Sequence, residues 1–381
     1  MFAEVVSSLG SYLLPFLLVL TVVVFIHELG HFLVGRWCGI KVDAFSIGFG
    51  PELFHHIDKH GTRWRLAALP LGGYVKFHGD ANGASMSDEA SIEAMPQDER
   101  DVTFAGQPVW KRFLTVAAGP AANFVLALVV FAGLFMIIGR PIVTPRVDGV
   151  RAGGAAAVAG FEQGDVVVEI DGQAIDSFES LQRIVMTSPG VDLHFVVDRA
   201  GKLVRMTAQP AVVNEDTALG PVRKGVLGIE SKAQDFHIQK YGPVDAVRLG
   251  AHETWFIVRQ TVNGIAGVLT GRESTKTLSG PAGLAQVSGE MAKHGPSALL
   301  NLIAILSISI GLLNLAPIPL LDGGHLLFYV FEAIRGRALP QRAQEFGFRI
   351  GIAVVGGLML LATFNDVTRL GPQILQWIQR G

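Results

Sequence analysis

Three residues at the end of the first apolar stretch have the types and the spacing of a metal-dependent hydrolase site. His27, Glu28 and His31 form an H-E-x-x-H motif, and on a helix the two histidines lie one turn apart on the same face. Both imidazoles can then bind one zinc ion, while Glu28 is close enough to act on a water molecule beside it. The motif continues directly from a charge-free run, where burying an ionisable residue costs about 2.5–3.5 kcal/mol. This placement favours a functional site over a pair of buried core histidines.

A third protein ligand is needed, because catalytic zinc sites typically have three. The best candidate is Asp322, which follows Pro317 and Pro319 and precedes two glycines. The prolines are expected to break the helix and the glycines to let the chain turn sharply. Backbone freed at membrane depth must line a cavity or be buried in protein, as a catalytic site requires. His325 is a competing ligand, and Asp322 could instead cap a helix end.

The composition indicates that these residues lie in a membrane. The chain has 381 residues, of which 50% are hydrophobic and 17% charged, whereas soluble domains have about 25% charged residues. Four charge-free apolar stretches, 5–26, 113–139, 295–321 and 350–365, approach the roughly 20 residues that a spanning helix needs. The net charge of −2 gives no sign of nucleic-acid binding, and the single Cys38 excludes an internal disulfide and a thiolate zinc cluster.

The distribution of basic residues predicts the orientation of the four stretches. Positive residues gather in the connection between the first and second stretches and in that between the third and fourth, which are therefore expected to be cytoplasmic. They are Arg36, Lys41, Lys111, Arg112, Arg335, Arg337, Arg342 and Arg349. The N-terminus, residues 140–296 and the C-terminal tail then lie outside the cytoplasm. Within the first connection, residues 82–102 are rich in acidic residues and are predicted to form a flexible loop.

The extracytoplasmic stretch has the pattern of a small soluble domain. An apolar strand ends in an Asp171-Gly172 hairpin turn, and a helix over 177–186 precedes strands over 192–198 and 203–209. This order resembles a bacterial PDZ domain in its circularly permuted form, in which the carboxylate-binding loop comes last, here at Gly225, Val226, Leu227 and Gly228. A small β domain without peptide binding is the alternative. Residues 242–269 are predicted to form an amphipathic helix that lies against the outer membrane face or the membrane-spanning core, with packing on the soluble domain as the alternative.

Two motifs together identify a family. H-E-x-x-H in the first stretch and N-x-x-P-x-P-x-L-D-G in the third resemble the site-2 protease family of intramembrane zinc metalloproteases, most closely its RseP-like branch. Residues 45–51 and 69–75 resemble the membrane-associated β loop of that family, residues 118–123 its second-segment motif, and residues 364–366 fall near its usual end. One PDZ-like domain stands where the best-known members have two.

The resemblance implies a fold class and an organisation. It is a polytopic α-helical membrane protein with four transmembrane helices, a membrane-associated β loop and an inserted, circularly permuted PDZ-like α+β domain. The predicted segments are the first helix (1–36), the β loop and flexible segment (37–112), the second helix (113–139), the periplasmic PDZ-like domain (140–232), an amphipathic helical region (233–296), the third helix (297–325), a cytoplasmic loop (326–349) and the fourth helix with the tail (350–381). The expected location is the bacterial inner membrane.

The resemblance also implies an activity. The chain is expected to be a zinc metalloendopeptidase that cuts within transmembrane segments of single-span proteins, such as anti-sigma factors or remnant signal peptides. A site-1-type protease would first trim the extracytoplasmic part of the substrate, and membrane lipid is the other expected partner. A metal-binding transporter or receptor is the main rival interpretation, but we find no repeated halves of the kind transporters show.

Site residues carry over from the family one by one. His27, His31 and Asp322 are the implied Zn²⁺ ligands, and Glu28 is the general base. Asn314 is expected to hold the substrate backbone or a developing oxyanion, with an interhelical hydrogen bond as the alternative. Gly48, Phe49 and Gly50 are expected to bind substrate through the β loop, onto which an unwound substrate could add as a strand. Asn123 is interpreted as a helix-packing residue in preference to a catalytic one.

Overall fold

The computed structural model describes residues 2–80, 92, 94–217, 220–231, 236–271 and 279–380. These residues divide into two compact units, which we describe in turn. The first unit consists of Met1–Ala132, Val247–Ile265 and Ser274–Gly381, and the second of Gly133–Ala246 and Ala266–Glu273.

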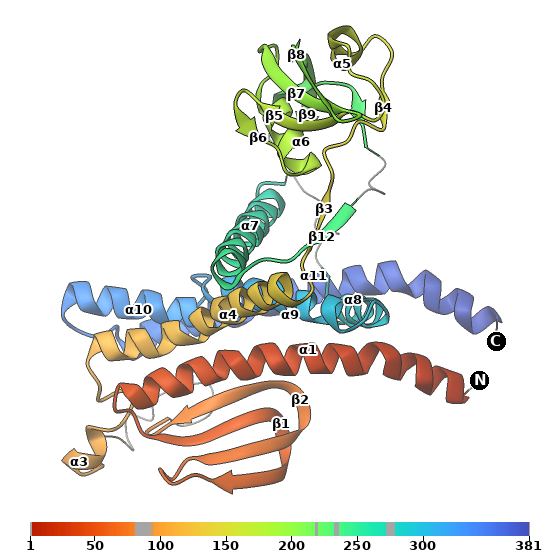
Figure 1. Cartoon of the computed structure of the whole chain (residues 1–381). Helices are drawn as coiled ribbons and strands as arrows, with labels where there is room; N and C mark the ends of the chain where they lie inside the picture. The colour runs from red at the N-terminus through yellow and green to blue at the C-terminus, as the bar shows by residue number, and fades with distance from the viewer. Residues whose placement is uncertain are drawn as a thin grey trace. The chain divides into compact units, whose positions relative to one another are not determined.

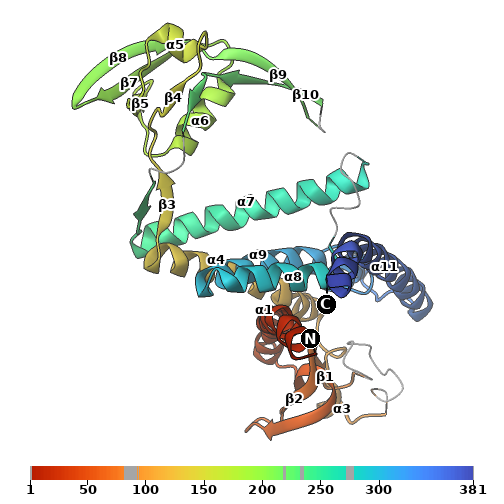
Figure 2. The ribbon, with the colours of Figure 1, turned by 90° about the vertical axis from the view of Figure 1, so that its right-hand side faces the viewer.

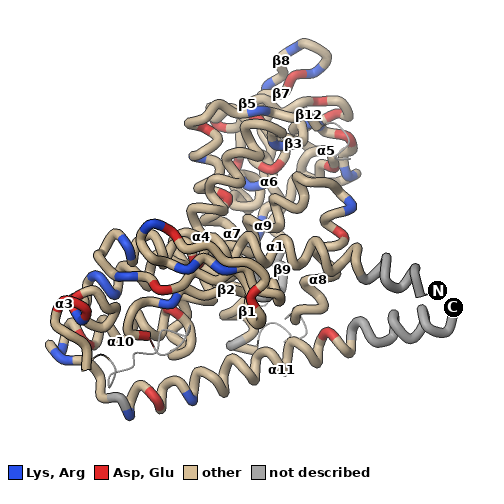
Figure 3. Tube along the Cα trace, turned by 90° about the horizontal axis from the view of Figure 1, so that it is seen from below, with Lys and Arg blue, Asp and Glu red and all other residues tan. Residues whose placement is uncertain are grey.

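Long apolar helices form the framework of the first unit. They are α1 (Phe2–Trp37), α4 (Val109–Ile137), α9 (Pro296–Asn314) and α11 (Gln341–Arg380). Among the described residues, the stretches long and apolar enough to cross a membrane are Gly10–Trp37, Val109–Ile137, Pro296–Asn314 and Arg342–Thr368. The four apolar stretches predicted from the sequence are therefore helical. In Figure 3 the middle of α11 is almost free of charged residues, as a lipid environment requires.

The third apolar stretch is a shorter helix than predicted. α9 begins after Gly295, whose φ of +95° is in the left-handed region, and Pro296 lies in its first turn. The helix ends at Asn314, and a non-helical segment with two prolines leads to α10 (Asp322–Arg335). The break that the prolines predict is therefore present within the segment 297–325, whereas part of 326–349, predicted as a loop, is helical. The prolines end α9 early by removing backbone donors, and the chain becomes helical again at Asp322.

The glycine pair after Asp322 provides close packing and not the sharp turn predicted for it. Gly323 and Gly324 lie in the first turn of α10, and neither has a positive φ. A Cβ on Gly323 would lie 2.3 Å from the carbonyl oxygen of Ala316, and one on Gly324 would lie 2.4 Å from that of Ile318. Only glycine therefore lets α10 begin against the segment before it, and this contact fixes the position of Asp322.

A β sheet lies beside α1 (Figures 1 and 2). It consists of β1 (Val42–Ile57) and β2 (Arg63–Phe77), and residues 44–47 of β1 pair with both 63–66 and 73–76 of β2. Aromatic side chains join the sheet to the helix, because the ring of Phe45 is centred 5.4 Å from that of Phe32 on α1 and 4.5 Å from that of Trp64. The predicted β structure is present, and its association with the membrane stays a prediction.

The segment predicted as a flexible loop over 82–102 lies partly outside the described residues, which omit 81–91 and 93. Its described end contains the short helix α3 (Gln97–Arg100). The backbone N–H of Lys41 donates to the carbonyl of Val102 at 3.0 Å, and Phe104 stacks on Phe77 of β2 with ring centroids 5.1 Å apart. The described end is thus anchored to the sheet, because its backbone and an aromatic ring have partners there.

Two more helices belong wholly or mostly to the first unit. They are α7 (Pro243–Leu269) and α8 (Pro281–Lys293), and α8 contacts α1 and α9. Asp366 of α11 accepts hydrogen bonds from the backbone N–H groups of Gly280 and Gly283, at 3.1 and 2.9 Å, and so caps α8. The helix predicted over 242–269 is present as α7, and its contact with the membrane stays a prediction. The predicted helical region 233–296 also contains a strand, β12 (Phe236–Gln239).

The second unit is an α+β domain (Figure 1). Its central sheet has the order β6-β5-β7-β8, in which the strands are β6 (Gln173–Ala174), β5 (Val166–Ile170), β7 (Leu193–Arg199) and β8 (Lys202–Ala208). Three strand pairs accompany it: β3 (Arg140–Val143) with β12, β4 (Gly149–Val150) with β11 (Ile229–Glu230), and β9 (Ala211–Thr217) with β10 (Gly220–Val226). The helices are α5 (Ala155–Ala159) and α6 (Phe178–Thr187). The predicted helix and strands agree with α6, β7 and β8 to within one residue.

Backbone angles explain one hairpin turn of this domain, and a buried ion pair joins two of its segments. Asp171 and Gly172 have φ values of 49° and 82°, as the hairpin turn predicted between β5 and β6 requires. Beneath the sheet, Arg199 donates to both carboxylate oxygens of buried Asp165, at 2.7 and 2.8 Å. Burial alone would raise the pKa of Asp165, but these hydrogen bonds lower it. The ion pair therefore ties β7 to the turn before β5.

Candidate metal centre

The two histidines of α1 lie where helical spacing predicts. His27 and His31 are 7% and 8% exposed, so the protein shields both rings from bulk solvent. Their Nε2 atoms are 3.2 Å apart, and the rings meet edge to face with centroids 4.8 Å apart. This arrangement directs two nitrogen lone pairs at one point beside the helix.

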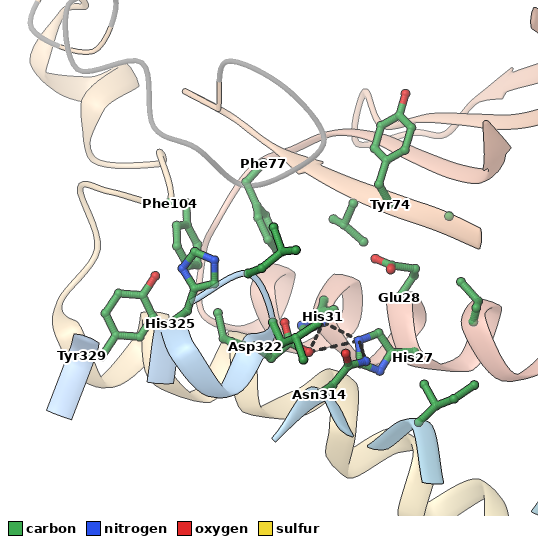
Figure 4. A pocket seen from close by; sticks show the side chains of 17 residues that line it. His27, Glu28, His31, Tyr74, Phe77, Phe104, Asn314, Asp322, His325 and Tyr329 are labelled. Atoms are coloured by element: carbon green, nitrogen blue, oxygen red, sulfur yellow. Dashed lines mark hydrogen bonds and ion pairs between the residues drawn. The ribbon is translucent and has the colours of Figure 1, made fainter. Parts of the chain in front are cut away.

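Asp322 completes the group from the first turn of α10. Its Oδ2 lies 3.1 Å from Nε2 of His27 and 3.5 Å from Nε2 of His31. In Figure 4 the three side chains converge on one point. Four ligands at 2.0–2.1 Å from a tetrahedral zinc ion would be about 3.3–3.4 Å from one another. The separations of 3.1 to 3.5 Å therefore match three corners of a zinc tetrahedron.

The donor set itself also fits zinc. Two imidazoles and one carboxylate are typical ligands of a catalytic zinc ion, and the fourth position is left for water or substrate. Oδ2 of Asp322 is buried and has no hydrogen-bond partner among the described residues, in the place where a cation would satisfy it. The geometry and the chemistry of the three residues thus agree.

Glu28 lies on the wall of the cavity that contains these three residues. The cavity has a volume of about 290 Å³. A Cβ added to Gly73 would lie 2.7 Å from the carbonyl oxygen of Ser46, so this glycine allows β2 to approach β1 closely, and it would lie in ordinary contact with Cγ of Glu28, at 3.4 Å. In Figure 4 the carboxylate is beside His27 and outside the group of His27, His31 and Asp322, so it is free to act on a water molecule bound there. The lining residues are Val24, His27, Glu28, His31, Gly73, Tyr74, Val75, Phe77, Phe104, Val116, Ile310, Asn314, Leu320, Leu321, Asp322, His325 and Tyr329.

The sequence predicts two further polar residues near the metal centre, Asn314 and His325, and they lie in different parts of the cavity. Nδ2 of Asn314, at the end of α9, is 3.3 Å from Nε2 of His27, and its side chain lines the cavity. His325 is outside the ligand group and lies with Phe104 and Tyr329 on the other side of Asp322 (Figure 4). Burial raises the pKa of Tyr329 above its usual value. Sequence reasoning did not identify Tyr329, because an aromatic residue on an apolar helix face has no distinctive pattern.

The residues of the β loop that the sequence predicts to bind substrate do not line the cavity. Gly48, Phe49 and Gly50 are described residues of β1, and none of them lines it. The lining comes instead from 73–75 of β2, and Phe49 stacks on Tyr74 with ring centroids 6.0 Å apart. A Cβ on Gly48 would lie 2.6 Å from the carbonyl oxygen of Leu69, so this glycine allows β1 to approach β2. Gly48–Gly50 thus support the wall that residues 73–75 form.

A separate cavity in the second unit contains the predicted peptide loop. Gly225, Val226, Leu227 and Gly228 line a cavity of about 260 Å³ together with Leu181 and Val185 of α6. A Cβ on Gly225 would lie 2.1 Å from the carbonyl oxygen of Val185, which explains the glycine by close approach to α6. Gly228 has a φ of +82°, so a larger residue would be strained there.

Helix α4 packs against the ring of His31, and at one position of α4 only glycine leaves room for this ring. A Cβ on Gly119 would lie 2.2 Å from Nε2 of His31, the atom that faces the metal position. We expect Gly119→Ala to weaken zinc binding by more than about tenfold, because the ring must move away from its ligand position. Zinc affinity would be measured on purified protein by competition with a chelator.

Gly133→Ala is the matched control for this prediction. Gly133 is also on α4, but a Cβ there has no atom within 4 Å. The control should bind zinc like the unaltered protein, because alanine only improves the helix. Native zinc affinity in Gly119→Ala would contradict the close contact between α4 and His31.

These features define a class: a multi-pass membrane protein whose H-E-x-x-H metal centre is on a spanning helix. A family model, Peptidase family M50, matches residues 15–358. The chain belongs to this family, the site-2 proteases, and is a zinc metalloprotease. It is 49% identical over 365 residues to Atu1380 of Agrobacterium fabrum, whose name proposes a zinc metalloprotease. The aligned region covers 95% of this chain and 97% of that relative. The chain is 38% identical over 380 residues to Metalloprotease MmpA of Caulobacter vibrioides, covering 94% and 95%.

Proposed function

We propose that this zinc metalloprotease cuts peptide bonds inside the membrane-spanning segments of single-span membrane proteins. The observation that carries the proposal is the position of the two metal-binding histidines on α1, within the apolar stretch Gly10–Trp37, beside a cavity walled by β2. A peptide bond that reaches this cavity must come from an apolar segment, since a polar chain would be costly at this depth.

Different residues of the cavity have different roles in the proposed reaction. His27, His31 and Asp322 hold zinc, which when bound supplies a Lewis acid that activates water and polarises the scissile carbonyl. Glu28 takes the proton from the attacking water and passes it to the leaving amine. The amide of Asn314 donates to the carbonyl oxygen of the substrate as negative charge develops there. No acyl-enzyme is needed, because water attacks the carbonyl directly.

Substrate binding is proposed to use the edge of β2. A membrane helix has all its backbone groups paired, so the segment must unwind before a bond becomes reachable. Among the described strands only β1 pairs with β2, and residues 73–75 line the cavity. An unwound segment can add to this edge as a strand, with its backbone bonded to β2 and the scissile bond beside Glu28.

The inserted domain is proposed to be a circularly permuted PDZ domain that limits access. Its cavity between α6 and residues 225–230 supports a PDZ-type groove, and the loop that ends with Gly228 follows α6 and the central sheet in the sequence of the domain. We infer from the charge pattern that this domain lies outside the cytoplasm, which would be the periplasm if the protease is in a bacterial inner membrane, as the family resemblance implies. Substrates would first lose their bulky periplasmic part to a site-1-type protease, and the domain would exclude those that have not.

The function is tested by cleavage in lipid bilayers. Purified protein in zinc-containing proteoliposomes would be given a single-span substrate with a short extracytoplasmic tail, and product ends would be mapped by mass spectrometry. We expect cuts inside the apolar stretch. A soluble peptide of the same cut sequence is the control and should be cut much more slowly, because it does not enter the membrane. Product ends confined to residues outside the apolar stretch would contradict the proposal.

Deleting residues 145–232 tests the role of the inserted domain. We expect the shortened protein to cut short-tailed substrates at the normal rate and to begin cutting substrates that retain a bulky periplasmic domain. Met186→Glu is the companion variant, because Met186 lines the groove and is 41% exposed, so a charge there blocks peptide binding without unfolding the domain. It should leave both rates unchanged. Loss of short-tailed cleavage in either folded, zinc-loaded variant would mean that the domain recognises substrate.

A further inference from the structure

Helix α4 contacts the outer nitrogen of each metal-binding histidine. Nδ1 of His31 donates to the backbone carbonyl of Thr115 at 2.9 Å. Nδ1 of His27 is 3.3 Å from the side-chain amide of Asn123, two helical turns further along α4. Both contacts are buried, and both leave Nε2 directed at the metal position. One helix therefore holds the two rings from behind.

The amide of Asn123 has an unexplained feature. Its Oδ1 is buried and has no hydrogen-bond partner among the described residues, while Nδ2 faces Nδ1 of His27. A histidine that binds a metal through Nε2 has its proton on Nδ1, so Nδ1 must donate and its partner must accept. The two amide atoms of asparagine exchange positions by a rotation of the side chain, and their assignment rests on the hydrogen bonds they make. With zinc bound, Oδ1 is the atom that faces His27.

We propose that Asn123 is a positioning residue of the zinc centre, whose Oδ1 accepts a hydrogen bond from Nδ1–H of His27. It does for His27 what the Thr115 carbonyl does for His31: it selects the ring form that offers Nε2 to zinc and fixes the angle of the ring. Partners of this kind typically change metal affinity by about 10–100-fold. The proposal concerns zinc binding, so it does not depend on where the substrate is cut.

The packing role of Asn123 uses different atoms. The hydroxyl of Ser307 on α9 donates to the backbone carbonyl of Asn123 at 2.9 Å, and a Cβ on Gly311 would be 3.3 Å from Cβ of Asn123. Neither contact involves the side-chain amide. Helix packing thus depends on the backbone and Cβ of this residue, whereas the amide is left for His27, and the two roles can be separated by mutation.

Three variants of the full chain test the proposal. Asn123→Leu keeps the size of the side chain but has no acceptor, Asn123→Asp keeps an acceptor at the same place, and Ser307→Ala removes only the packing hydrogen bond. Zinc affinity would be measured by chelator competition, Co²⁺-substituted protein by its visible absorption bands, and helix packing by the Tm of the metal-free protein.

We expect Asn123→Leu to bind zinc about 10–100-fold more weakly and to shift the Co²⁺ bands, because the His27 ring is no longer fixed. Asn123→Asp should restore native-like bands and affinity. Ser307→Ala should lower Tm and leave affinity and bands unchanged. Native zinc affinity and Co²⁺ bands in folded Asn123→Leu would overturn the proposal, and so would the same loss of affinity in Asn123→Leu and Ser307→Ala.

A measurement on the unaltered protein covers the case in which Asn123→Leu does not fold. Zinc-loaded protein with ¹⁵N-labelled histidine should show two slowly exchanging Nδ1–H protons, one for each zinc-binding histidine, because both have buried acceptors on α4. If only the His31 proton were protected, His27 would have no acceptor, and the assignment of Asn123 would be wrong.

Discussion

Glu28→Gln is expected to abolish cleavage while the protein keeps its zinc. Glutamine has nearly the same shape as glutamate, so the cavity wall that includes this side chain still accommodates it. The proposed ligand atoms belong to His27, His31 and Asp322, and these are unchanged. The neutral amide cannot take a proton from water, and loss of general-base catalysis reduces rates by about 10²–10⁴-fold. Zinc content and cleavage of a single-span substrate would be measured on the same preparation.

Two further variants make this result specific. Glu28→Asp keeps a carboxylate but withdraws it by one methylene, so we expect a rate between those of the unaltered protein and Glu28→Gln. Glu179→Gln changes a glutamate whose side chain is 62% exposed on α6 of the inserted domain, and it should cut at the normal rate. Near-normal cleavage by zinc-loaded Glu28→Gln would remove Glu28 from the reaction.

Asp322→Ala is expected to lose both zinc and activity. This residue supplies an oxygen that lies within 3.5 Å of both histidine Nε2 atoms, and alanine leaves two protein ligands where three are typical. Losing a ligand should weaken binding by more than the roughly 10–100-fold that loss of an orienting partner costs. Zinc affinity would be measured by chelator competition, and cleavage at saturating zinc would show whether activity returns with the metal.

His325→Ala is the matched control, because it removes the competing ligand considered from the sequence. His325 lines the same cavity but is not among the residues whose ligand atoms converge. The control should keep zinc with native affinity. Full metal occupancy in Asp322→Ala, together with loss of zinc in His325→Ala, would show that the ligand assignment is reversed.

The sequence by itself determined the features that depend on neighbouring residues. A helix places residues four apart on one face, so the spacing of His27 and His31 predicted their convergence before any fold was known. Hydrophobic length predicted the four apolar helices in the same way. The Asp171-Gly172 pair predicted the hairpin turn, since few residues adopt the backbone angles it needs.

The choice between Asp322 and His325 needed more than local pattern. Both are polar residues close to a helix break, and the sequence favoured Asp322 largely through its resemblance to a family. The structure separates them because α10 begins at Asp322 and places His325 nearly one turn further along the helix, in another part of the cavity. That position depends on where the helix restarts, which the prolines alone did not specify.

Tertiary structure alone decided which distant residues support the site. Gly119 and Asn123 have the composition of a helix-packing motif, and their contacts with His31 and His27 exist only because α4 passes behind α1. Residues 73–75 line the cavity in place of 48–50 because β1 and β2 pair in a particular register. Such contacts depend on how closely two backbones approach, and that distance is set by the packing of the whole unit and not by any short stretch of sequence.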